Sequence, residues 1–251
     1  MIGSEPSPPD WDELAPEGLA GVLDPADAAG GKNRLIDRAQ KRAIVKHGGS
    51  VRGRQVLDFG CGNGRLSGWL VARGATVHGV DTSPEMVAQS RKQVPEASFE
   101  VLDPERVQLG SRSYDLVLSA GVLCFLPEMQ LTKSLAAMRE SLRPGGRIVA
   151  LEKVSDGTPG LGWTLEQYRR CFVQAHLELR EPRVVRLGFS GVLGFTARRP
   201  YFARLPILPA ILELEARRHV GKGFADGQYA DYLFIAKSGA TTPTSPLEQE
   251  I

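Results

Sequence analysis

The sequence has 251 residues, a formal net charge of +2 and 42% hydrophobic residues, which suits one α/β domain with additions. No long basic run is present, so charge alone does not indicate a nucleic-acid partner. No apolar stretch is long enough to span a bilayer, and the acidic, proline-rich first residues differ from a secretory signal, so we expect a cytoplasmic protein without stable membrane insertion.

Hydrophobic periodicity first predicts a helix over residues 32–47, and from there strands and helices alternate. The expected strands are 55–59, 76–80, 98–102, 114–119, 147–152, 183–189 and 231–237, and the expected helices between them are 66–73, 84–93, 131–142 and 165–176. This alternation predicts a parallel sheet with helices on both faces. Such sheets bind ligands beyond the carboxyl ends of their strands.

Three segments fall outside this alternation. Residues 1–31 are rich in Pro, Gly, Asp and Ala, and we expect them to be partly disordered or to form a lid. Residues 32–238 form the domain itself, with an insert at 190–230 that is apolar and flanked by arginines. The small, polar tail 239–251 is expected to be disordered. The three cysteines are widely spaced, so we expect neither a metal site nor a disulfide framework.

The strongest motif is the Gly-x-Gly-x-Gly turn of residues 60–64, which follows an apolar strand and opens a helix. Glycines there let the backbone turn tightly and let a ligand approach closely. The dinucleotide fingerprint Gly-x-Gly-x-x-Gly requires a glycine where Arg65 stands, which argues against a nicotinamide oxidoreductase. Asp58 precedes the turn by two residues, and an acid at that position suits a ligand that carries an ammonium group.

This segment is similar to motif I of the class I S-adenosylmethionine-dependent methyltransferases, and the resemblance extends over residues 55–153. It implies a Rossmann-like sheet of seven mostly parallel strands, with helices on both faces, an antiparallel last strand and a helical cap. It also implies S-adenosylmethionine as the cofactor. The glycine-rich turn would carry the methionine part, and Asp58 would lie near the amino group. Residues 32–238 would then be the methyltransferase domain.

Two further acids follow predicted strands. Asp81 can accept hydrogen bonds from both ribose hydroxyls, because Ser83 and Pro84 already supply the start of the next helix. The resemblance implies that Asp103 meets the adenine amino group, although the same carboxylate also suits a helix start. The residues expected at the cofactor are Asp58, Gly60, Cys61, Gly62, Asn63, Gly64, Asp81, Thr82, Met86, Asp103, Pro104, Ser119 and Ala120.

Three other positions bear on the chemistry. Arg34 would pair with the cofactor carboxylate, or else belong to a solvated helix start. Glu152 ends the fifth strand and is the candidate general base, with a salt bridge to Lys153 as the alternative. Phe125 stands where many relatives have a histidine, which makes the site more apolar.

The resemblance implies methyl transfer to oxygen, nitrogen or carbon of a small, partly apolar biosynthetic intermediate, recognised by the insert. One alternative is a protein or RNA acceptor, although the sequence has neither a basic face nor an appended domain for RNA. Another is a cofactor that binds without donating its methyl group, in a cyclisation or decarboxylation. The apolar stretch within 198–218 is expected to pack as a core helix, with contact to a membrane surface as the alternative.

Overall fold

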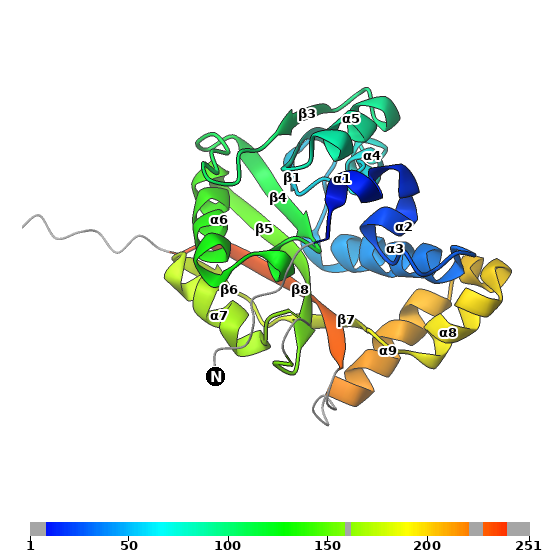
Figure 1. Cartoon of the computed structure of the whole chain (residues 1–251). Coiled ribbons are helices and arrows are strands. Elements are labelled where there is room, and N and C mark those ends of the chain that lie inside the picture. Colours follow the sequence, from blue (N-terminus) through cyan, green and yellow to red (C-terminus); the bar gives the residue numbers. More distant parts are fainter. Residues whose placement is uncertain (1–8, 159–161, 221–227, 240–251) are drawn as a thin grey trace, which may run out of the picture.

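The computed structural model describes residues 9–158, 162–220 and 228–239, and a single mixed sheet forms its centre (Figure 1). The strands are β1 (Gln55–Phe59), β2 (Thr76–Asp81), β3 (Ser98–Val101), β4 (Tyr114–Ala120), β5 (Leu142–Ser155), β6 (Leu177–Leu179), β7 (Arg183–Leu187) and β8 (Tyr229–Ser238). They are ordered β3-β2-β1-β4-β5-β8, with β1 to β5 parallel and β8 antiparallel to β5. The predicted Rossmann-like sheet with an antiparallel last strand is therefore confirmed.

The far edge of β8 is shared by two short strands. β6 pairs with the end of β8 and β7 with its beginning, so the two strands together occupy one position in the sheet. Pro182 lies between them and has no backbone N–H to donate to a continuous ladder. The pattern predicted only the strand at 183–189, because the three residues of β6 are too few to show alternation. The described sheet thus has eight strands in seven positions.

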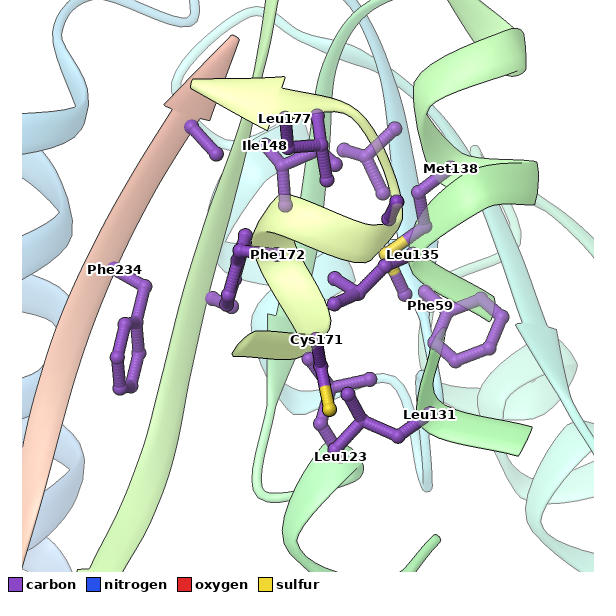
Figure 2. Close-up of a cluster of buried hydrophobic side chains, with 14 of the residues drawn as sticks. Phe59, Leu123, Leu131, Leu135, Met138, Ile148, Cys171, Phe172, Leu177 and Phe234 are labelled. Carbon is purple, nitrogen blue, oxygen red and sulfur yellow. The ribbon is translucent and has the colours of Figure 1, made fainter. Parts of the chain in front are cut away.

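Helices cover both faces of the sheet. They are α3 (Gly31–Ala43), which continues into a π turn η2 (Ile44–Gly48), α4 (Arg65–Val71), α5 (Pro84–Gln93), α6 (Glu128–Ser141) and α7 (Leu165–Gln174). On one face, α6 and α7 bury Leu135 and Phe172 against the sheet, and Phe234 of β8 stacks on Phe172 with ring centroids 5.6 Å apart (Figure 2). On the other face, α3 and α4 bury Leu35 and Leu70. Central strands that are covered on both faces are necessarily apolar at consecutive positions.

Two segments lie outside this core. The first comprises α1 (Trp11–Leu14), η1 (Ala15–Glu17) and α2 (Leu19–Val22), which lie across the carboxyl ends of the strands (Figure 1). The second is the insert, in which α8 (Gly191–Arg198), η4 (Pro200–Arg204) and α9 (Leu208–Val220) pack against α3, and α9 also packs against β7. Most of the tail for which we predicted disorder, residues 240–251, and residues 1–8 lie outside the described residues.

Candidate functional site

A cavity of about 410 Å³ opens beyond the carboxyl ends of β1, β2 and β4, where an open α/β sheet binds its ligands. Its volume lies in the range of small-molecule sites, about 300–1,000 Å³. Seven residues predicted at the cofactor line it: Gly60, Gly62, Asp81, Thr82, Met86, Pro104 and Ala120. Three more predicted residues, Asp58, Cys61 and Asn63, line a smaller hollow of about 30 Å³ that shares Gly60, Gly62 and Ala120 with the cavity. The sequence therefore identified one coherent site.

The glycine-rich turn is held close to the backbone of Val80 and to the side chain of Val122. The N–H groups of Gly60 and Cys61 both donate to the carbonyl oxygen of Val80, at 2.8 and 3.0 Å. Gly60 has a φ of +70°, and a Cβ built on it would lie 2.2 Å from a methyl carbon of Val122. Only glycine fits here, because the turn touches the loop after β4 and adopts a left-handed conformation.

Asp81 joins the end of β2 to the glycine-rich turn. One carboxylate oxygen accepts a hydrogen bond from the N–H of Gly62 at 2.8 Å, and the other accepts one from Ser83 at 3.0 Å. Burial raises the pKa of Asp81, and the backbone N–H donors oppose that rise. Each carboxylate oxygen has a second acceptor position. Asp81 therefore has capacity for the hydroxyls of a ribose at the cavity wall.

The smaller hollow contains two acceptor side chains, Asp58 and Asn63, and also Arg65, whose guanidinium pairs with Asp37. Asp58 is buried, accepts a hydrogen bond from the Ser67 hydroxyl at 2.6 Å, and has a pKa raised by burial to about 6. Asn63 donates through its amide nitrogen to the carbonyl of Gly18 at 2.6 Å. Its amide oxygen is buried and has no partner among the described residues. An orphaned acceptor beside a carboxylate fits a ligand with an ammonium group, as the methionine end of S-adenosylmethionine has.

Four predicted residues line neither space. Gly64 caps α4 in a left-handed conformation, and Ser119 is buried and donates to Glu152. Asp103 is exposed and accepts a hydrogen bond from the N–H of Glu105 at 2.9 Å, while its neighbour Pro104 lines the cavity. Arg34 is exposed and donates to the carbonyl of Ala29 at 3.1 Å. The cofactor contacts of these four stay predictions.

Glu152 lies behind the cavity wall, on the side of the sheet that α7 covers. The residue has no exposed surface, and its carboxylate accepts hydrogen bonds from the N–H groups of Val122 and Cys124, at 3.1 and 3.2 Å, and from the Ser119 hydroxyl at 3.1 Å. Burial raises the pKa of Glu152 to about 7, although these donors oppose the rise. The geometry makes Glu152 an anchor for the loop after β4, and its predicted role as a base stays a prediction.

The N-terminal segment closes the front of the cavity. Trp11 and Val22 line it, and the Trp11 ring meets Phe125 edge to face with centroids 5.4 Å apart. Asp12 accepts a hydrogen bond from the Ser83 hydroxyl, which ties α1 to the start of α5. The lid that the sequence offered as one alternative for this segment is therefore consistent with these contacts.

Sequence reasoning missed a cation beside this wall. The ammonium group of Lys153 lies 5.7 Å from the ring centroid of Phe125 and 4.9 Å from that of Tyr229, at the start of β8. No ion pair of Lys153 occurs among the described residues. Because β8 returns antiparallel to β5, Tyr229 is brought next to Lys153 by a pairing that spans more than seventy residues. No local pattern signals such a pairing.

The buried carboxyl of Glu152 predicts a measurable pH dependence. A raised pKa means that the native state keeps a proton that the unfolded chain releases between about pH 4.5 and 7. We expect the stabilising contribution of this group to be full below that window and to be lost as pH rises through it. The wild-type free energy of unfolding should therefore fall relative to that of Glu152→Gln, measured by urea denaturation at successive pH values. The titration of Asp58 is common to both proteins, so it cancels in the difference between their free energies of unfolding. If that difference does not change with pH, the buried carboxyl of Glu152 does not titrate with the raised pKa.

Residues 56–146 match the family model of a methyltransferase domain. Aklanonic acid methyltransferase DauC from Streptomyces sp. (strain C5) is 35% identical over 115 residues, which is 43% of this chain and 51% of that protein. A TehB-like SAM-dependent methyltransferase from Corynebacterium glutamicum has a TM-score of 0.56 and 24% identity over 90% of this chain and 97% of that one. The [4+2]-cyclase SpnF has a TM-score of 0.60 and 18% identity over 94% and 99%.

The chain spans about half the length of the curated relatives it matches. The matched region contains the glycine-rich turn, Asp81 and the loop after β4, which together form the cavity wall. Sequence motif, fold and family model agree on one assignment. Residues 56–146 are thus identified as a methyltransferase domain of the class I S-adenosylmethionine-dependent type, a family whose cofactor is S-adenosylmethionine.

Proposed function

We propose that this protein transfers the methyl group of S-adenosylmethionine to a small-molecule acceptor. The observation that carries the proposal is the cavity itself, in which the residues of motif I meet an apolar wall and the N-terminal segment. Gly60 and Gly62 provide the turn, Asp81 provides an acceptor for ribose hydroxyls, and the hollow at Asp58 and Asn63 accepts an ammonium group.

Two further surfaces are proposed to hold the rest of the cofactor. Met86, Leu102 and Val107 give an apolar wall for a planar base, close to the Asp81 carboxylate. The backbone of Gly60, which packs against the Val122 side chain and lines the cavity, is proposed to face the middle of the ligand. When bound, S-adenosylmethionine supplies a methyl group on a positively charged sulfur. The task of the chain is to hold the acceptor in line with that methyl group and to exclude water.

Glu152 contributes to this task through the backbone. Its carboxylate gathers the N–H groups of Val122 and Cys124, and the next residue along the loop, Phe125, lines the cavity. We propose that Glu152 positions this wall and that an acceptor which loses its proton unaided needs no protein base. In this proposal Glu152 does not take a proton from the acceptor; it holds in place the loop that lines the cavity.

The acceptor side is proposed to lie next to Phe125, which lines the cavity, with Lys153 and Tyr229 beside that ring and outside the cavity lining. Two aromatic rings with a cation between them suit an acceptor that is partly aromatic and carries an acidic group. Lys153 lacks an ion-pair partner among the described residues, so an acceptor anion would be its counter-charge. The name of the relative aklanonic acid methyltransferase is that of an enzyme acting on an acid, which supports the same class of acceptor.

The alternative activity, in which the cofactor keeps its methyl group, would use the same cofactor site. The fold of the [4+2]-cyclase SpnF is similar along nearly the whole chain, so the fold alone does not separate methyl transfer from chemistry that leaves the methyl group in place. From the sequence we expect the insert at 190–230 of this chain to recognise the acceptor. The described helices of the insert do not line the cavity, so that assignment stays a prediction. Formation of S-adenosylhomocysteine is what distinguishes the two activities.

The activity test is a screen of aromatic acids, phenols and their methyl esters with S-adenosylmethionine, read out as S-adenosylhomocysteine formed. We expect product with acidic aromatic acceptors. For an acceptor found in this way, Lys153→Met should raise KM by about tenfold with a much smaller change in kcat, because an ion pair to a bound anion is lost. Cofactor that binds but yields no S-adenosylhomocysteine with any acceptor would contradict methyl transfer to a small molecule.

The cofactor site is tested by a matched pair of glycines. Gly60 and Gly53 have φ values of +70° and +69°, so alanine at either position carries a similar backbone strain. A Cβ on Gly60 would overlap Val122, whereas one on Gly53 meets nothing within 4 Å. We therefore expect Gly60→Ala to abolish the thermal stabilisation by S-adenosylmethionine and Gly53→Ala to preserve it. Equal stabilisation of both variants would show that the turn does not contact the cofactor.

A further inference from the structure

The insert exposes a cluster of large apolar side chains that the fold does not use. We call this cluster the η4 tip; its members are Tyr201, Phe202, Leu205, Ile207 and Ile211. Tyr201 is 85% exposed and Ile207 61% exposed, whereas the inward face of α9 is already buried through Leu208 and Leu212. The sequence predicted a core helix within 198–218, and the structure shows one buried face with an apolar surface left over. Contiguous exposed apolar patches mark interaction sites.

Cations surround the η4 tip. Arg198, Arg199 and Arg204 are exposed and form no ion pair with any described residue. Beside the tip is an open hollow of about 620 Å³ whose lining contains no acidic residue. Its lining is Arg38, Lys41, Arg42, Lys46 and Arg73, together with Val45, Trp69, Pro206 and Pro209. The chain as a whole carries a net charge of only +2, so this positive charge is a local concentration, and it forms a basic face that was not expected from the sequence.

Part of this positive charge is left without a counter-charge in the structure. Lys41 pairs with Asp37, and Lys46 pairs with Glu213. Arg42 and Arg73 have no carboxylate partner among the described residues, and Arg73 lies over the Trp69 ring at 4.3 Å. Arg38 donates to the carbonyls of Ala203 and Leu205, which fixes the η4 tip beside the hollow. The apolar and basic parts are therefore one rigidly connected surface.

The positive charge around the η4 tip favours an anionic lipid surface over a second copy of the chain as its partner. A second copy of the chain would bring the arginines around one tip against those around the other, and like charges across an interface are costly. An anionic lipid surface offers the opposite charge together with an apolar interior for the exposed side chains. Figure 1 shows α8 and α9 on the side of the molecule opposite α6 and α7, so such a surface can approach them without meeting those helices.

We propose that the η4 tip and the adjoining basic hollow seat this protein on an anionic membrane surface. The apolar side chains of the tip enter the interface, and the arginines meet lipid phosphates. Among the described residues no helix is long and apolar enough to cross a membrane, so the contact proposed is peripheral. The proposal does not depend on methyl transfer, because no residue of this surface lines the cofactor cavity.

The test is flotation of the full chain with vesicles of phosphatidylcholine alone and of phosphatidylcholine mixed with phosphatidylglycerol. We expect the protein to float with the mixed vesicles at low salt and to be released from them at high salt. It should not bind the vesicles of phosphatidylcholine alone. Tyr201→Ser with Ile207→Ser, and separately Arg198→Gln with Arg199→Gln and Arg204→Gln, should each weaken binding by about tenfold or more.

Matched variants control for lost hydrophobicity and lost charge. Met129→Ser with Val173→Ser removes two side chains that are 70% and 69% exposed elsewhere. Lys92→Gln, Arg106→Gln and Lys133→Gln together remove the same charge as the arginine variant from exposed positions away from the tip. Both control proteins should float like wild type, and all variants should retain the wild-type thermal stability.

Two results would overturn the proposal. One is no flotation with anionic vesicles at low salt, or flotation that the tip variants leave unchanged. The other is a concentration-dependent dimer in sedimentation that Tyr201→Ser with Ile207→Ser dissociates, which would assign the surface to a second copy of the chain.

Discussion

Glu152 carries a carboxylate with no contact to solvent, and the loop after β4 is built around it. The oxygens of Glu152 accept hydrogen bonds from the N–H groups of Val122 and Cys124, groups that no strand or helix satisfies. From the other side, Val122 touches Gly60 closely enough to exclude any side chain there. The loop is therefore held between a buried acid and a glycine. Its position decides where Phe125 stands, and with it the shape of the cavity.

Burying that carboxylate is costly, and the cost is offset by the donors around it. Replacing one partner would leave either an unpaired acid or unpaired N–H groups in the interior. The same reasoning applies on a smaller scale to Asp58, which is buried with the Ser67 hydroxyl as its donor, and to Asp81, which is held by two backbone N–H groups. The acids at the strand ends are thus part of the framework as well as the binding surface.

Much of the fold could be predicted, and so could most of the residues that the structure brings together at the cavity, because both depend on local patterns. Alternating apolar runs indicate the strands, and the turn at 60–64 with Asp81 indicates which ends bind the ligand. Strand alternation puts Glu152 on the same face as Ile148 and Val154, but that α7 covers this face is not local information. The approach of Tyr229 to Lys153 depends on the antiparallel return of β8, and Arg34 is exposed although its helix was predicted. Long-range strand pairing and the direction of side chains are therefore the features that could not be predicted from the sequence.

The central claim is that the cavity beyond β1, β2 and β4 binds S-adenosylmethionine. Isothermal titration of the purified chain with S-adenosylmethionine, S-adenosylhomocysteine and NAD tests it most directly. We predict binding of the first two compounds and none of NAD, because Arg65 stands where a dinucleotide turn needs its third glycine. Binding of NAD alone, or of none of the three, would contradict the assignment of the glycine-rich turn and the function built on it.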